Sequence, residues 1–122
     1  MNKLVAFILL LALFSCKTDN DSGIPCTEDP VAALNITVVD VETDLIISEN
    51  VEVIATDGSY TETLELVGGV TPVFVGAWER SGNYTVNVTA TGYAPFTSDE
   101  IVVTADECHV IPYFAEVMLQ PE

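Results

Sequence analysis

Apolar and polar side chains alternate with a period of two residues along most of the chain from Ala32 onward. The alternation is clearest after Gly82, where Tyr84, Val86 and Val88 are separated by polar residues. This period is typical of a β-strand that buries one face, because successive side chains of a strand point to opposite sides of its sheet. No stretch has a helical period, and the many Val and Thr residues disfavour helix. The pattern therefore predicts an all-β domain.

Turn-forming residues divide this region into about seven short strands. Asp57-Gly58 is typical of a tight hairpin turn, and Gly68-Gly69 ends the strand that follows it. We expect strands over residues 34–39, 51–56, 59–66, 73–78, 84–90, 101–104 and 108–119, the last one bent near Pro112. Each strand has an apolar face that must meet another sheet, which favours an antiparallel β-sandwich.

A continuous apolar run, residues 4–14, precedes this region and follows the basic Lys3. It is long enough for the core of a signal peptide, whereas a membrane-spanning helix needs about 20 apolar residues. The run ends in Leu13-Phe14-Ser15-Cys16, which resembles the lipobox of bacterial lipoproteins. That resemblance implies that residues 1–15 are cleaved off and that Cys16 is diacylated and becomes the first residue of a membrane-anchored chain. The alternative is an ordinary secretory leader cut elsewhere.

The next residues, 16–30, contain almost no large apolar side chain and therefore cannot order themselves by burial. We expect a lipidated N-terminus and flexible tether over residues 16–30, followed by one domain over residues 31–122. The stretch Lys17-Thr18-Asp19-Asn20-Asp21 resembles the surface-export signals of lipoproteins from Bacteroidota. This resemblance implies an outer-membrane lipoprotein at the cell surface; the alternative is the periplasmic face.

The chain has three cysteines. With Cys16 assigned to lipid, Cys26 and Cys108 remain as an even pair in an exported protein, where disulfides form and persist. We expect them to form one disulfide. A zinc site is not expected, because one histidine and two thiols at this spacing do not make a tetrahedral ligand set. A catalytic pair of Cys108 and His109 is not expected either, because adjacent side chains of a strand point to opposite faces.

The chain is strongly acidic, with 19 acidic and 3 basic residues and a formal net charge of −16. This charge excludes nucleic acid as a partner, because Lys and Arg are needed to neutralise phosphates. Such a surface keeps an exposed protein soluble; the alternatives are binding of calcium or of a basic partner. If the first strand extends far enough, Asp40, Glu42 and Asp44 project to one side and form a weak candidate calcium site. The simpler interpretation is a charged strand end that blocks edge pairing.

The sequence contains no set of residues typical of an enzyme. His109 is the only histidine, and no nucleophile elbow, H-E-x-x-H motif, glycine-rich phosphate loop or EF-hand pattern occurs. We therefore expect no catalysis and no cofactor, apart from the calcium alternative. Trp78 is a weak candidate for stacking on a sugar together with Phe74, which a regular strand would place on the same face. The simpler expectation is that Trp78 belongs to the core.

The segment Gly82-Asn83-Tyr84-Thr85-Val86-Asn87-Val88, followed by Gly92-Tyr93, resembles the carboxypeptidase regulatory-like domains, whose fold is similar to transthyretin (prealbumin). Residues 36–40 and 106–119 extend the likeness over most of residues 32–120. The resemblance implies a non-catalytic spacer, folding aid or interaction module. The expected function is therefore a membrane-anchored structural or interaction module with an unidentified protein or glycan partner. The alternative is a glycan- or calcium-binding module.

Overall fold

The structure, a computed structural model, describes residues 26–122. The predicted signal peptide, residues 1–15, and the predicted lipidation residue Cys16 lie outside the described residues. Within the described range there is no helix that could cross a membrane. The strands of this range are β1 (Ala32–Asp40), β2 (Val51–Asp57), β3 (Tyr60–Thr63), β4 (Glu65–Val67), β5 (Val73–Trp78), β6 (Gly82–Ala90), β7 (Phe96–Thr97), β8 (Ile101–Val103) and β9 (Tyr113–Leu119).

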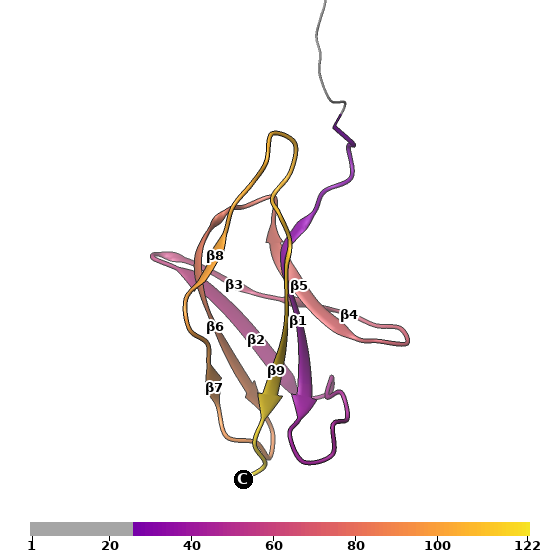
Figure 1. Cartoon of the computed structure of the whole chain (residues 1–122). Coiled ribbons are helices and arrows are strands. Elements are labelled where there is room, and N and C mark those ends of the chain that lie inside the picture. Colours follow the sequence, from indigo (N-terminus) through magenta and orange to yellow (C-terminus); the bar gives the residue numbers. More distant parts are fainter. Residues whose placement is uncertain (1–25) are drawn as a thin grey trace, which may run out of the picture.

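These strands form two sheets that face each other as a β-sandwich (Figure 1). One sheet has the order β4-β5-β1-β9; the other has the order β3-β2-β6-β7, with β8 also paired to β6. The predicted all-β sandwich is confirmed. Its pairs are antiparallel except for β1 and β9, the first and last strands, which run parallel from Leu34 beside Tyr113 to Asp40 beside Leu119. Alternation predicts which face of a strand is buried but not which strand lies beside it, so this parallel pair was not predicted.

The single strand predicted over residues 59–66 is two strands, β3 and β4, which belong to different sheets. Leu64 lies between them, is only 4% exposed, and donates its N–H to the carbonyl of Val53. The chain therefore crosses from one sheet to the other at Leu64. The sequence pattern did not reveal this crossing, because the alternation of apolar and polar residues continues through it.

The predicted strand over residues 108–119 was too long at its start, since β9 begins only at Tyr113. Cys108 and His109 instead lie in a tight turn between Ala105 and Val110, which form a bridge. The carboxylate of Asp106 accepts the backbone N–H groups of Cys108 and His109 at 2.8 and 2.9 Å. An aspartate that bonds the backbone two and three residues ahead favours a turn over an extended strand.

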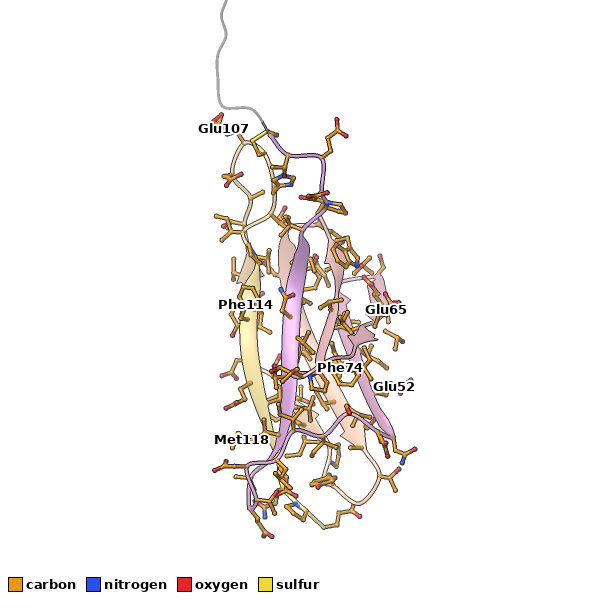
Figure 2. All side chains as sticks on the ribbon, turned by 90° about the vertical axis from the view of Figure 1, so that its right-hand side faces the viewer. Glu52, Glu65, Phe74, Glu107, Phe114 and Met118 are labelled. Carbon is orange, nitrogen blue, oxygen red and sulfur yellow. A yellow bond between two sulfur atoms is a disulfide. The ribbon has the colours of Figure 1, made fainter. Side chains whose placement is uncertain are left out.

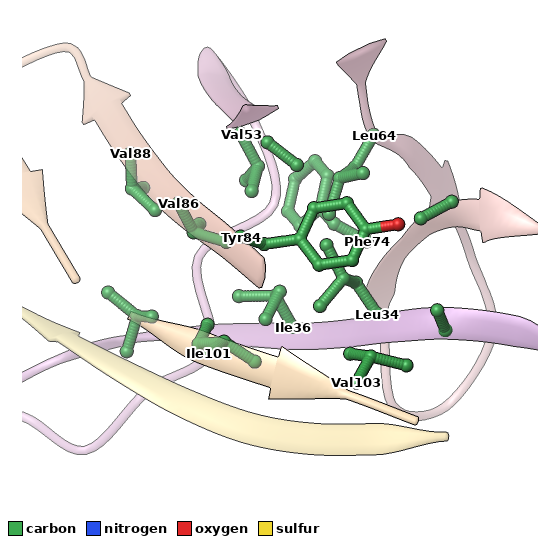
Figure 3. Close-up of a cluster of buried hydrophobic side chains, with 14 of the residues drawn as sticks. Leu34, Ile36, Val53, Leu64, Phe74, Tyr84, Val86, Val88, Ile101 and Val103 are labelled. Atoms are coloured by element: carbon green, nitrogen blue, oxygen red, sulfur yellow. The ribbon is translucent and has the colours of Figure 1, made fainter. Parts of the chain in front are cut away.

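The core lies between the two sheets and contains the side chains that the alternation predicted to be buried (Figure 3). Tyr84, Val86 and Val88 of β6 are fully buried, as are Leu34, Ile36 and Val38 of β1. The hydroxyl of Tyr84 is satisfied within the domain, because it donates to the carbonyl of Arg80 at 2.6 Å. The prediction of which side chains of β1 and β6 are buried is thus confirmed.

Candidate functional site

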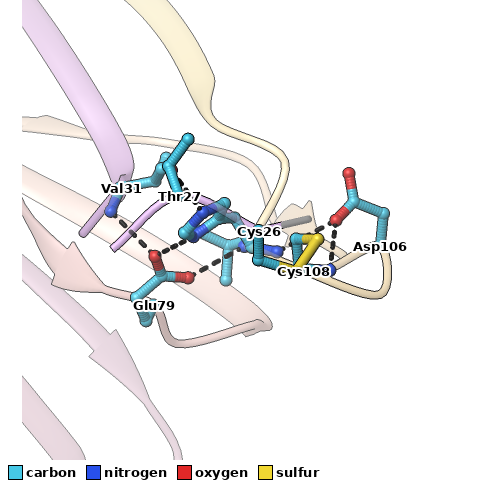
Figure 4. Close-up of polar contacts among 8 residues, drawn as sticks. Cys26, Thr27, Val31, Glu79, Asp106 and Cys108 are labelled. Carbon is cyan, nitrogen blue, oxygen red and sulfur yellow. Dashed lines mark hydrogen bonds and ion pairs between the residues drawn. A yellow bond between two sulfur atoms is a disulfide. The ribbon is translucent and has the colours of Figure 1, made fainter. Parts of the chain in front are cut away.

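Cys26 and Cys108 form a disulfide across 82 sequence positions, with their Cα atoms 5.3 Å apart (Figure 4). This separation lies within the range of about 4.4 to 6.8 Å that disulfides require. The bond joins the start of the described chain to the turn before β9. The predicted pairing of Cys26 with Cys108 is therefore present, and it attaches the C-terminal part of the predicted tether to the domain.

The carboxylate of Glu79 lies next to the disulfide and joins three segments of the chain (Figure 4). It accepts the N–H of Val31 at 2.9 Å, the N–H of Val110 at 3.1 Å, and a bond from the ring of His109. Glu79 itself follows β5 in a left-handed conformation, with φ of 50°. One side chain at the end of β5 thus holds the residue before β1 and the turn before β9.

His109 contacts two partners, Glu79 through Nδ1 and Thr27 through Nε2, the latter at 3.0 Å from Oγ1. Because a carboxylate only accepts hydrogen bonds, Nδ1 carries a proton, and in a neutral ring Nε2 accepts from the threonine hydroxyl. The order hydroxyl, imidazole, carboxylate is that of a catalytic triad. The sequence did not predict the contacts of His109 with Thr27 and Glu79. These two residues are distant from His109 in the sequence and come close to it only through the disulfide and the sheet.

The backbone N–H groups around these three side chains are already hydrogen-bonded. Acyl transfer needs backbone N–H groups that are available to stabilise a developing oxyanion. The N–H groups of Val31 and Val110 are bonded to Glu79, and those of Cys108 and His109 are bonded to Asp106. None of these four donors remains for a substrate. We call this cluster of Cys26, Thr27, Glu79, Asp106, Cys108 and His109 the entry brace.

The two carboxylates of the entry brace are held in their charged forms. Burial raises the pKa of Glu79, but the hydrogen bonds from His109, Val110 and Val31 outweigh it, so that the pKa lies below its usual value. The backbone N–H groups of His109 and Cys108 likewise lower the pKa of Asp106. Each of these bonds favours the carboxylate over the carboxylic acid.

The predicted row of Asp40, Glu42 and Asp44 is not formed, because β1 ends at Asp40. One Asp40 oxygen accepts the N–H groups of Glu42 and Thr43 at 2.7 and 3.0 Å, and the other accepts the hydroxyl of Tyr93 at 2.6 Å. The bond from Tyr93 is the largest cause that lowers the pKa of Asp40. Asp40 therefore closes its turn with one oxygen and holds Tyr93 with the other. Residues 26–122 contain no group of three His, Cys, Asp or Glu side chains placed to hold a metal.

Trp78 is 47% exposed, so the expectation that it belongs to the core was wrong. The predicted shared face with Phe74 is also wrong, because Phe74 is only 4% exposed and packs in the core. Between them Ala77 is fully buried and has a positive φ of 56°, which interrupts the regular alternation of β5. Trp78 is thus an exposed aromatic at the end of β5, without Phe74 beside it as a second stacking surface.

Arg80 forms a second polar cluster that sequence reasoning missed. Its guanidinium lies 3.8 Å from the centroid of the Tyr60 ring, and its Nη1 is 3.0 Å from Asp57. Burial and the hydrogen bond to Glu62 raise the pKa of Tyr60 to about 12. Arg80 is the only basic residue other than His109 after Lys17, and this isolation was a signal of a structural role. The cluster joins the β2–β3 hairpin to the start of β6.

The side of the sandwich between β9 and the segment that carries β7 and β8 is open. A cleft of about 210 Å³ lies there. It is lined by apolar residues and by the acidic residues Asp99, Glu100 and Glu116. This cleft is a candidate binding feature of the domain. No single sequence motif predicts it, because its residues come from several strands.

No protein-family model matches the chain, and no curated protein matches its sequence.

Proposed function

We propose that the protein is an outer-membrane lipoprotein, displayed at the cell surface, whose β-sandwich is a non-catalytic structural or interaction module. The observation that carries the proposal is the bond between Cys26 and Cys108. Because the chain has three cysteines, Cys16 is left without a cysteine partner in its own chain. A cysteine at the end of an apolar leader that takes no part in a disulfide is the residue that lipidation requires.

The side chains best suited to chemistry support a non-catalytic module, because they are engaged in holding the fold together. His109 is bonded to Glu79 and Thr27, and Asp40 is bonded to its own turn and to Tyr93. These bonds fix the ends of strands, which is the role expected of polar residues in a small domain with a modest core.

The proposed relation to carboxypeptidase regulatory-like domains is supported by the region after β6. Gly92 has a positive φ of 87°, which favours glycine, and Tyr93 reaches across the domain to Asp40. A Gly-Tyr corner after a long alternating strand is the feature on which the resemblance depends. Such domains serve as spacers or interaction modules, which agrees with the proposal.

Glycan binding is the second candidate function, since the exposed Trp78 offers an aromatic face to a sugar. Titration of the full chain with cell-surface glycans, followed by isothermal titration calorimetry, tests this alternative. A saturable change that Trp78→Ala removes supports it, and the absence of any change in the wild type speaks against it.

Cell fractionation tests the main proposal. We expect to find the wild-type chain in the membrane fraction. We also expect protease added to intact cells to digest it. Cys16→Ala is expected in soluble fractions, because the acyl chains are lost. Cys26→Ser is the matched control, since it removes a cysteine of the disulfide and is expected to stay with the membrane. Membrane retention of Cys16→Ala, or a soluble wild type, contradicts the proposal.

A further inference from the structure

We propose that the open edge of β9 binds an extended segment of a partner protein that carries alternating apolar and basic side chains, and that this segment adds to the sheet as a further strand. The inference names the partner chemistry of the interaction module and rests on the proposed function. Four observations carry it: the length of the edge, its exposed apolar side chains, the adjacent cleft, and the charge.

β9 is a long edge strand with an unpaired side. It spans seven residues and pairs with β1 on one side, while no named strand within residues 26–122 pairs with its other side. The opposite edge of the same sheet, β4, has only three residues, and the edge strand β3 of the other sheet has four. Proteins commonly shorten, charge or cover their edge strands to prevent pairing with other chains. β9 is long, and Glu116 is its only charged residue.

The outward face of β9 exposes large apolar side chains. Phe114 is 72% exposed and Met118 is 38% exposed, and both lie along β9 in Figure 2. The register places Phe114 beside Asn35 and Met118 beside Val39 on the neighbouring strand. In a strand added to the free edge of β9, the outward residues are the basic ones, and the apolar stems of their Lys or Arg side chains cover Phe114 and Met118.

The inward side chains of an added strand meet the cleft between β9 and the segment of β7 and β8. Tyr113, Ala115 and Val117 of β9 line this cleft together with Phe96 and Ile101. Its wall therefore offers apolar contacts to every second residue of an extended segment. Main-chain hydrogen bonds to the β9 edge supply affinity in such complexes, and pockets for alternate side chains supply specificity.

The negative charge around the edge of β9 favours a basic partner over a second copy of this chain. Asp99 and Glu100 line the same cleft, and Glu116 lies on the outward face of β9 between Phe114 and Met118. The whole chain has 19 acidic against 3 basic residues, and Arg80 is already paired with Asp57. Two copies would therefore bring like charges together along the edge, whereas Lys or Arg side chains complement it.

Model peptides bound to the detergent-solubilised full-length lipoprotein test this proposal. The probe is a nine-residue peptide with alternating Val and Lys; the comparison peptide has Glu in place of Lys. We expect the Lys peptide to bind at least about tenfold more tightly. N-methylation of every second amide removes main-chain donors on one edge of the peptide. One set of methylated amides is expected to weaken binding at least about tenfold and the other set less than about threefold, because only one edge faces β9.

Variants and hydrogen exchange locate the binding. The triple variant Asp99→Lys, Glu100→Lys, Glu116→Lys is expected to weaken binding of the Lys peptide at least about tenfold. The matched control is Glu65→Lys, because Glu65 lies on the opposite edge strand, β4 (Figure 2). Its expected effect on the affinity for the Lys peptide is less than about twofold. The bound Lys peptide is expected to slow amide exchange within residues 113–119.

Several results overturn the proposal. These are equal binding of the Lys and Glu peptides, equal effects of both methylated sets, an equal loss in Glu65→Lys, or no change in amide exchange within residues 113–119. Concentration-dependent self-association of the free chain, lost in the triple variant, identifies a second copy as the occupant and also overturns it. Fractionation of Cys16→Ala is independent of these measurements, so the membrane proposal can stand when the peptide proposal fails.

Discussion

Glu79 and His109 are 30 positions apart in the sequence and are hydrogen-bonded through Oε2 and Nδ1 at one end of the sandwich. Through the same carboxylate, Glu79 also holds the N–H groups of Val31 and Val110. One residue at the end of β5 thus positions both the entry to β1 and the turn before β9. Since β1 and β9 pair with each other, the contact fixes the relative placement of the first and last strands.

Acid should weaken this contact. The pKa of Glu79 is lowered in the folded chain, so its contribution to stability is present above the usual value of 4.5 and is lost as the pH falls through the folded value. We expect Glu79→Gln to lower the unfolding temperature at pH 7 and to make the unfolding temperature less sensitive to acid below pH 4.5, as checked by thermal melts at each pH. The exposed Glu52→Gln is the control. Parallel pH profiles for wild type and Glu79→Gln would rule out this role.

Reduction of the disulfide should destabilise the domain. Closing a loop across 82 positions restricts the unfolded chain, and removal of such a bond costs about 2 to 5 kcal/mol. Denaturant titrations with and without reductant measure the difference. The double variant Cys26→Ser, Cys108→Ser is expected to match the reduced wild type and to be insensitive to reductant. Alkylation of both thiols without prior reduction would show that the bond does not form.

The two faces of β6 should respond differently to truncation. Val86→Ala removes methyl groups from a fully buried position and is expected to cost about 1 to 3 kcal/mol of unfolding free energy. Thr85→Ala, one position away on the other face, is expected to cost less than about 1 kcal/mol. Chemical denaturation of both variants checks this. Equal losses of unfolding free energy would show that the assignment of the buried and exposed faces of β6 is wrong.

A side chain at Gly76 should disturb the contact between the sheets. A Cβ there would lie 2.4 Å from Cδ2 of the buried Leu64 and 2.8 Å from an oxygen of Glu62, whose other oxygen accepts the N–H of Ala77. We expect Gly76→Ala to cost about 1 to 3 kcal/mol by overpacking. Gly68→Ala is the control, because a Cβ there meets nothing within 4 Å, and is expected to change stability by less than about 1 kcal/mol. Equal unfolding midpoints for the two variants would exclude this crowding.

The sequence predicted the fold class and the core residues well, since the alternation of Tyr84, Val86 and Val88 is a local signal of a half-buried strand. It also predicted the pairing of Cys26 with Cys108, because two cysteines remained once Cys16 was assigned to lipid. The parallel pairing of β1 with β9 and the crossing at Leu64 depend on contacts between distant segments. Alternation within a strand contains no information about such contacts.

The candidate site was predicted less well, for reasons that differ between residues. Asp40, Glu42 and Asp44 were expected to form a row of carboxylates, but the Asp40 carboxylate accepts the N–H groups of Glu42 and Thr43 and closes a turn where β1 ends. Trp78 was assigned to the core, but the positive φ of Ala77 interrupts the strand before it. Glu79 was not singled out at all, because the sequence does not show that three distant segments converge on its side chain.

The intact mass of the mature chain tests the central claim most directly. The purified membrane form is analysed by mass spectrometry without reduction, and its N-terminal peptide is then identified after digestion. The proposal predicts a chain that begins at Cys16, carries the mass of at least a diacylglyceryl group on that residue, and is two hydrogens lighter than the dithiol because of the bond between Cys26 and Cys108. A chain that begins elsewhere and carries no lipid would contradict it.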